Sequence, residues 1–129
     1  MTKVKANVEK AWDCLRQKSN RRNLRVKVAK QDFIRWYNKE EKKCHYCKIP
    51  ESKFIEIWGP FYGGKRGWRL EVDRKNPEDC YAEGKIVLAC CLCNCAKSDK
   101  ISYDDFKKEL GPVIKNIWQK EAKTNGSSF

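Results

Sequence analysis

Two cysteine pairs are the residues of this 129-residue chain whose types and spacing point most directly to chemistry. Cys44 and Cys47 form one Cys-x-x-Cys pair, and Cys90 and Cys93 form a second. Two intervening residues let both sulfurs of a pair approach one ion, and four thiolates complete a tetrahedral Zn²⁺ shell. Because such a shell leaves no position open for water, the sequence predicts a structural zinc ion that joins two distant segments.

The remaining cysteines and the single histidine leave part of this ligand set open. Cys91 and Cys95 are alternatives to the members of the second pair, although only that pair repeats the spacing of the first. Cys14 and Cys80 have no partner at metal-binding spacing and are expected to be ordinary thiols. His45 lies inside the first pair and is an alternative ligand, with a solvent-facing side chain the preferred expectation.

The sequence favours neither a secreted protein nor one that spans a membrane. No apolar run approaches the roughly 20 residues that a bilayer crossing requires, and the basic N-terminus lacks the apolar core of a signal peptide. The chain is therefore expected to be intracellular, where thiols stay reduced and cysteine clusters bind metals. A disulfide scaffold remains the alternative interpretation of the eight cysteines.

The charge of the chain is strongly positive and unevenly distributed. There are 29 Lys and Arg against 17 Asp and Glu, a formal net charge of +12. Residues 1–43 hold 14 basic and 5 acidic residues of this total. The excess favours a polyanionic partner, most commonly nucleic acid, over a merely solvated basic surface. Charge alone does not distinguish DNA, RNA and anionic lipid.

Oxygen-bearing side chains near the cysteine pairs suit a second kind of metal site. Asp73 ends a predicted strand, and Asn94 follows the second cysteine pair. An acid at the end of a strand and an amide on the following helix form a ββα unit that can hold Mg²⁺ beside a phosphate. Alone, the acid would be a turn residue and the amide a helix cap, but together and between two cysteine pairs we interpret them as ligands.

This layout resembles the HNH, or ββα-metal, endonucleases, whose zinc-binding members frame the active site with two Cys-x-x-Cys pairs. The family usually has a histidine after the strand-ending acid, where this chain has Arg74. A rare-cutting restriction branch has instead an Asp-Arg pair, a tyrosine eight residues after the Asp and an Asn thirteen residues after the tyrosine. The matching residues here are Asp73, Arg74, Tyr81 and Asn94, and the likeness covers about residues 33–118.

The resemblance implies an α+β fold with a ββα-metal (HNH, treble-clef-like) core and a four-cysteine zinc site, flanked by N- and C-terminal helices. It implies that Asp73 and Asn94 hold a catalytic Mg²⁺ or Mn²⁺ ion. Tyr81 would activate or orient the attacking water, and Arg74 would assist Tyr81 or contact the phosphate. These four would be the catalytic residues of a deoxyribonuclease.

The activity that the resemblance implies is sequence-specific hydrolysis of double-stranded DNA by a type II restriction-like enzyme. A homodimer is expected, because two-fold protein symmetry matches a palindromic site. Such a protein would be cytoplasmic, in a prokaryote or encoded by a phage or virus. The alternatives are a homing or phage-encoded nicking endonuclease and a non-catalytic zinc module that binds nucleic acid.

Two basic clusters are the expected DNA-binding segments. One lies near the end of the N-terminal helix, and the other occupies a glycine-rich turn over 59–67 that also carries aromatic residues. Phosphate contacts give affinity, whereas contacts to base edges give specificity. The expected DNA contacts are Arg21, Arg22, Arg25, Lys65, Arg66, Arg69 and Lys97.

Apolar periodicity predicts the elements that position these residues. Val4, Val8, Trp12 and Leu15 predict an N-terminal helix, which residues 19–23 interrupt. The other predicted elements are an extended segment over 24–28, a helix over 30–42, and strands over 54–58, 68–73 and 85–89.

The C-terminal part of the chain is predicted to be helical. Ser102 begins a capping box for a helix that Gly111-Pro112 interrupts and that continues through Trp118. We therefore expect a basic N-terminal helix or arm over 1–32, an HNH endonuclease domain with its zinc site over 33–123, and a flexible tail over 124–129.

Overall fold

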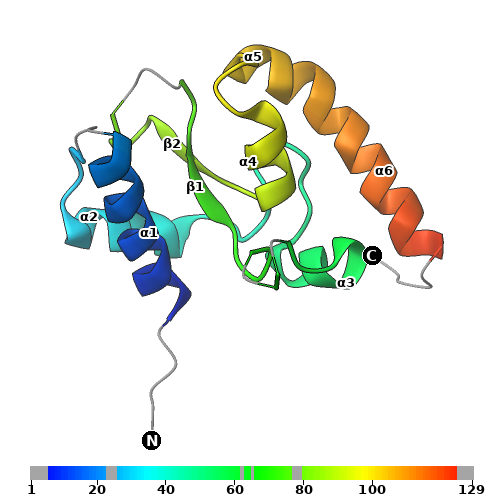
Figure 1. The fold of residues 1–129 in the computed structure, drawn as a ribbon, viewed down its shortest axis with the longest axis horizontal. Coiled ribbons are helices and arrows are strands. Elements are labelled where there is room, and N and C mark those ends of the chain that lie inside the picture. Colours follow the sequence, from blue (N-terminus) through cyan, green and yellow to red (C-terminus); the bar gives the residue numbers. More distant parts are fainter. Residues whose placement is uncertain (1–5, 23–25, 62, 65, 77–79, 125–129) are drawn as a thin grey trace, which may run out of the picture. The chain divides into compact units, whose positions relative to one another are not determined.

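The computed structural model describes residues 6–22, 26–61, 63–64, 66–76 and 80–124 of the chain. Helices and a small antiparallel sheet make up the fold, which confirms the predicted α+β class. The helices are α1 (Asn7–Arg22), α2 (Lys30–Lys39), α3 (Phe54–Trp58), α4 (Cys91–Lys97), α5 (Tyr103–Asp105) and α6 (Gly111–Thr124), and the strands are β1 (Glu71–Arg74) and β2 (Ile86–Ala89) (Figure 1). A 3₁₀ turn at Glu51–Lys53 precedes α3. No helix in these ranges is long and apolar enough to cross a membrane.

The chain divides into two compact units. The first unit contains residues 1–41 and 72–87, and the second contains residues 42–71 and 88–129. The predicted domain limits at residues 32 and 123 stay predictions, and the predicted tail lies outside the described residues except for Thr124.

Aromatic residues join α1 to α2 in the first unit. Phe33 is fully buried in α2, and its ring centroid lies 5.2 Å from that of Trp12 in α1. The predicted interruption of the N-terminal helix at residue 19 is wrong, because α1 continues to Arg22. Ser19 is buried and follows Leu15 by four residues, so it continues the buried face of the helix instead of ending it.

The segment over 54–58 is a helix, and the strand predicted there is wrong. Its alternating apolar residues fit a strand as well as a helix. In the structure Phe54 and Ile57, three residues apart, are both buried, which is the spacing of one helix face. The 3₁₀ turn leads into the helix, and Gly59 ends it with a positive φ of 78°. Because α3 replaces the first strand, the described part of the glycine-rich turn over 59–67 follows a helix and not a strand.

Strands β1 and β2 are the two strands of the predicted ββα unit, and they pair in one sheet. The predicted strand over 68–73 begins later, at Glu71, and extends to Arg74. The strand predicted over 85–89 is confirmed as β2, all of whose residues are buried. Val26 is extended, as predicted, and forms a parallel bridge with Tyr81. Residues 24 and 25 lie outside the described residues.

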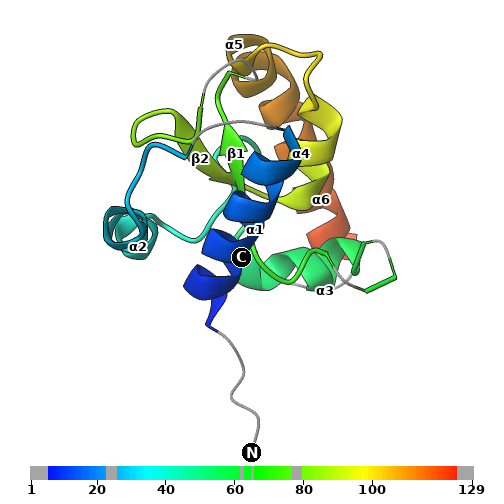
Figure 2. The ribbon, with the colours of Figure 1, turned by 60° about the vertical axis from the view of Figure 1, so that its left-hand side comes forward.

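The C-terminal helical segment of the second unit is continuous, so the predicted interruption at Gly111-Pro112 is wrong (Figure 1). It begins as predicted, because Oγ of Ser102 accepts a hydrogen bond from the Asp105 backbone N–H at 3.1 Å. A π-helical turn at Phe106–Leu110 joins α5 to α6, and Gly111 N–H donates to the Phe106 carbonyl. A proline lacks the N–H that a regular α-helix requires at an interior position, and the π-helical turn directly before Pro112 accommodates it within the continuous segment. The far end of α6 contacts α3 (Figure 2).

Gly111→Ala is expected to destabilise the second unit. A Cβ at this position would lie 2.6 Å from the backbone oxygen of Tyr46, which cannot retreat as a flexible side chain would. We expect a loss of about 1–3 kcal/mol in the free energy of unfolding, measured by denaturant titration. Asn116→Ala, at an exposed position of the same helix, is the control. An unchanged unfolding midpoint for Gly111→Ala would contradict this close approach.

Candidate functional site

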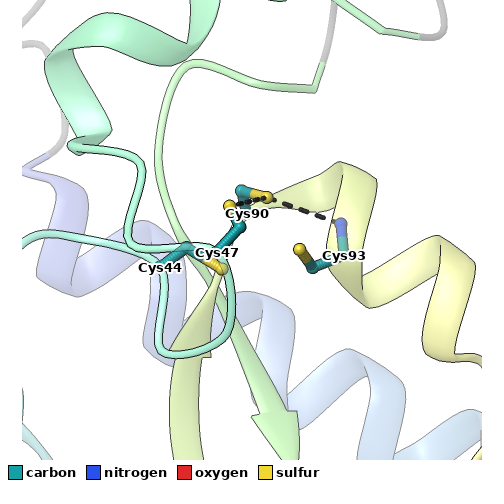
Figure 3. Close-up of side chains that lie close together, drawn as sticks. All are labelled: Cys44, Cys47, Cys90 and Cys93. Carbon is teal, nitrogen blue, oxygen red and sulfur yellow. Dashed lines mark hydrogen bonds between the residues drawn. The ribbon is translucent and has the colours of Figure 1, made fainter. Parts of the chain in front are cut away.

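The four predicted zinc ligands converge in the second unit (Figure 3). Their sulfur atoms all lie within 4.8 Å of one another, and all four side chains are buried. Cys44 and Cys47 stand in a turn after α2, Cys90 follows β2, and Cys93 lies in the first turn of α4. The cluster can therefore hold a metal ion such as zinc.

Backbone hydrogen bonds fix the loop that carries the first pair. The N–H of Cys44 donates to the Ile49 carbonyl at 2.9 Å, which closes the turn. The N–H of His45 donates to the Leu88 carbonyl at 2.8 Å and so joins the turn to β2. Nε1 of Trp118 donates to the Cys47 carbonyl at 2.8 Å. Strand β2 and helix α6 thus support the same cysteine loop.

Within the second pair, the start of helix α4 orients the sulfurs. Cys90 is the N-cap residue, and its Sγ accepts a hydrogen bond from the backbone N–H of Cys93 at 3.4 Å (Figure 3). The Sγ atoms of Cys47 and Cys90 are 3.8 Å apart, which links the two pairs directly. A thiolate at a helix N-terminus is favoured by the exposed N–H groups there.

The electrostatics of the cluster suit a divalent cation. Burial opposes ionisation of Cys44, but hydrogen bonds from Cys47, Cys90 and Cys93 outweigh it and lower the pKa of Cys44. The neighbouring sulfurs Cys44 and Cys47 raise the pKa values of Cys90 and Cys93. Four buried thiolates this close repel one another, and a divalent cation removes that repulsion. The donor set therefore fits Zn²⁺, which takes thiolate ligands in tetrahedral geometry.

The other sulfurs and the histidine lie outside the cluster. All eight cysteines are among the described residues, and none of them forms a disulfide there. Cys91 is buried and Cys95 is exposed, and neither joins the four-sulfur group. His45 is half-buried, not solvent-facing as expected: its Nε2 lies 2.7 Å from the Tyr103 hydroxyl, and the two rings stack.

Three predicted catalytic residues lie in the first unit. Asp73 and Arg74 end strand β1, and Tyr81 precedes β2. The guanidinium carbon of Arg74 is 5.4 Å from the centroid of the Tyr81 ring, within the range of a cation–π contact. Arg74 is 6% exposed and Tyr81 is 2% exposed. The Lys27 N–H donates to the Tyr81 carbonyl at 2.8 Å, which fixes the tyrosine backbone.

Asn94, the fourth predicted catalytic residue, lies on α4 in the second unit. Its Nδ2 donates to Oε1 of Glu71 at 2.9 Å, and Glu71 is ion-paired with Arg66. Glu71 has no role among the predictions from sequence. The available signal was an acid between two apolar strand residues, Leu70 and Val72, five residues after an arginine. Because Asp73 and Asn94 belong to different units, their sharing of one ion stays a prediction.

The expected DNA contacts have different environments. Arg21 is exposed on α1. Lys97 is 1% exposed at the end of α4, and its contact with DNA stays a prediction. Arg66 is ion-paired with Glu71. Arg69 is half-buried, and its Nη1 donates to the Leu70 carbonyl at 3.3 Å. Arg25, Lys65 and the side chain of Arg22 lie outside the described residues.

The turn after α3 presents a large exposed aromatic ring. Phe61 and Arg66 exchange two backbone hydrogen bonds of 2.9 and 3.1 Å. Trp68 is 60% exposed, and its Nε1 donates to the Gly64 carbonyl at 2.7 Å. The indole is thus exposed and fixed in orientation.

The sheet, the helix that follows it and the four-cysteine cluster together form the fold of an HNH endonuclease. Among solved structures, the chain is similar to that of the rare-cutting HNH restriction endonuclease PacI, for which a mechanism of DNA perturbation is described. The TM-score is 0.84 at 25% sequence identity, over 95% of this chain and 86% of that chain. The family resemblance seen in the sequence is therefore confirmed. No protein-family model and no curated protein sequence matches the chain.

Proposed function

We propose that the chain is a metal-dependent endonuclease that hydrolyses double-stranded DNA at specific sequences, as a type II restriction enzyme does. The observation that carries the proposal is the likeness to an HNH restriction endonuclease over 95% of the chain at a TM-score of 0.84. The net charge of +12 supports DNA as the substrate. The nuclease domain would comprise residues 33–123, with residues 1–32 as a basic arm.

The Asp73 carboxylate and the Asn94 amide oxygen would bind the catalytic Mg²⁺ or Mn²⁺ ion. Both are oxygen donors, which these hard cations prefer. The bound ion would polarise the scissile phosphate and stabilise the departing oxygen. The zinc in the four-cysteine cluster would be structural, because four thiolates leave no position for water or substrate.

Tyr81 and Arg74 would act on the attacking water. The cation–π contact between the Arg74 guanidinium and the Tyr81 ring supports this assignment, because it holds the two side chains next to each other. Tyr81 would activate or orient the attacking water, and Arg74 would assist Tyr81 or contact the phosphate. The backbone bond from Lys27 supports a fixed position for the tyrosine.

Trp68→Ala is expected to weaken DNA binding. The proposal is supported by an exposed indole that one hydrogen bond fixes in a turn between basic residues. An inserted ring would unstack a base step of the duplex, and stacking of an aromatic ring on an unstacked base contributes about 1–3 kcal/mol. We expect a loss of this size in a fluorescence-anisotropy titration, and a smaller loss for Trp68→Phe, which keeps an aromatic face. Equal affinity of the alanine variant would remove Trp68 from the DNA interface.

A homodimer would match a palindromic DNA site. Val113 and Ile117 are exposed apolar residues of α6 and make this helix the candidate interface. Measuring the mass of the protein in solution, free and with DNA, tests this part of the proposal.

The nuclease proposal is tested by incubating the zinc-loaded protein with a supercoiled plasmid and Mg²⁺ or Mn²⁺. Linear product that EDTA abolishes supports a restriction-type enzyme. Nicked circles alone would support a nicking endonuclease instead. Binding without metal-dependent cleavage of either the plasmid or a genome-sized duplex, in both metals, would overturn the nuclease proposal and indicate a non-catalytic zinc module.

A further inference from the structure

The proposed metal ligand Asn94 has a carboxylate neighbour, Glu71, at the start of β1. Nδ2 of Asn94 donates to Oε1 of Glu71 at 2.9 Å, within a single compact unit. Glu71 is 9% exposed, so this carboxylate lies in a fixed, largely dry position. An ionised carboxylate only accepts hydrogen bonds and can therefore face only the NH₂ end of the amide. The amide oxygen Oδ1 consequently points away from Glu71.

Arg66 fixes Glu71 from its other side. Nε of Arg66 donates to Oε2 of Glu71 at 2.7 Å, and Nη2 donates to Oε1. Such a two-pronged pair fixes the plane of the carboxylate as well as its position. The bond to Glu71 raises the pKa of Arg66 above its ordinary value, so the guanidinium stays charged and balances the carboxylate. Glu71 is thus an oriented acceptor whose charge is already compensated.

We propose that Glu71 is a positioning residue, which turns the amide of Asn94 so that Oδ1, and not the NH₂ group, faces the divalent cation. This inference rests on the proposed function, in which Asn94 binds that cation. The two ends of an amide differ little in shape, and rotation by half a turn would direct two N–H dipoles at the ion. Divalent cations of this kind bind oxygen, so only one of the two orientations binds metal.

Two double variants isolate the acceptor at position 71. Both variants carry Arg66→Met, so that no half-buried guanidinium is left without its counter-charge. One variant adds Glu71→Gln, and the other adds Glu71→Met. Gln and Met are similar in size, but only Gln offers an oxygen to Asn94. Mn²⁺ affinity of the zinc-loaded proteins is measured by electron paramagnetic resonance. We expect the Gln variant to bind within about threefold of wild type and the Met variant about tenfold or more weakly.

Equal Mn²⁺ affinity of the two double variants would overturn the role of Glu71. Asn94→Ala separates this failure from failure of the proposed function, because unchanged Mn²⁺ binding in that variant would remove Asn94 itself from the metal site. Zinc content and thermal unfolding verify the fold of each protein.

If the Met double variant does not fold, the double variant Arg66→Met with Glu71→Gln decides the question by comparison with wild type. It keeps an oxygen acceptor and removes the charge. Affinity within about threefold of wild type supports the positioning role, whereas a tenfold loss would show that the charge acts on the cation directly and would overturn it.

Discussion

Cys44→Ser is expected to release the zinc ion and unfold the second compact unit. Structural zinc contributes an apparent free energy of about 10–16 kcal/mol in small zinc domains, whereas a whole domain is stable by about 5–15 kcal/mol. Loss of the metal therefore removes a free energy as large as the whole free energy of unfolding of such a domain. The expected readouts are a fall in zinc content from one ion to none per chain and the loss of cooperative thermal unfolding.

The buried sulfurs explain why one serine has so large an effect. Cys44 lies within 4.8 Å of the other three sulfurs, and its loop also binds β2 through His45 and α6 through Cys47. The matched control is Cys14→Ser, because Cys14 lies in the first unit and outside the cluster. A folded, fully zinc-loaded Cys44→Ser protein would mean that this ligand set is wrong.

Tyr81→Phe is expected to slow DNA cleavage by about 10²–10⁴-fold while leaving DNA affinity unchanged. The substitution keeps the ring beside Arg74 and removes only the hydroxyl, so the buried contact at 5.4 Å is preserved. General acid–base catalysis by one positioned side chain contributes a rate factor of this size. Single-turnover cleavage with saturating protein measures the rate, and anisotropy without divalent metal measures the affinity.

Tyr37→Phe is the control for the tyrosine variant, because it makes the same chemical change in α2 of the same unit. Its cleavage rate should equal that of the wild type. An undiminished rate for Tyr81→Phe would remove the phenol from the mechanism. A parallel loss of DNA affinity would instead make Tyr81 a structural or DNA-contacting residue.

Local spacing was enough to predict the metal cluster and several elements. The two Cys-x-x-Cys pairs identify four ligands without structural help, since each pair has the geometry of a metal-binding turn. Ser102 marks a helix start through a bond that spans three residues. Strand β2 is a continuous apolar run that ends at the second pair. Each of these signals lies within a few neighbouring residues.

The features that could not be predicted from the sequence depend on contacts between distant residues. Residues 54–58 fit a strand and a helix equally well, and burial of Phe54 and Ile57 on one side decides for the helix. Gly111 reads as a helix breaker, but in the fold its missing Cβ lets the helix approach Tyr46. Glu71 acquires a role only through Asn94, which lies 23 residues later.

Cleavage of DNA by this chain at a defined sequence is best tested by sequencing the ends of the fragments. The zinc-loaded protein is incubated with a genome-sized duplex and Mg²⁺ or Mn²⁺, beside an Asp73→Asn variant that lacks the proposed metal-binding carboxylate. We predict discrete ends that share one short sequence with the wild type, and intact DNA with the variant. Intact DNA with the wild type in both metals, or random ends that persist with Asp73→Asn, would contradict the claim.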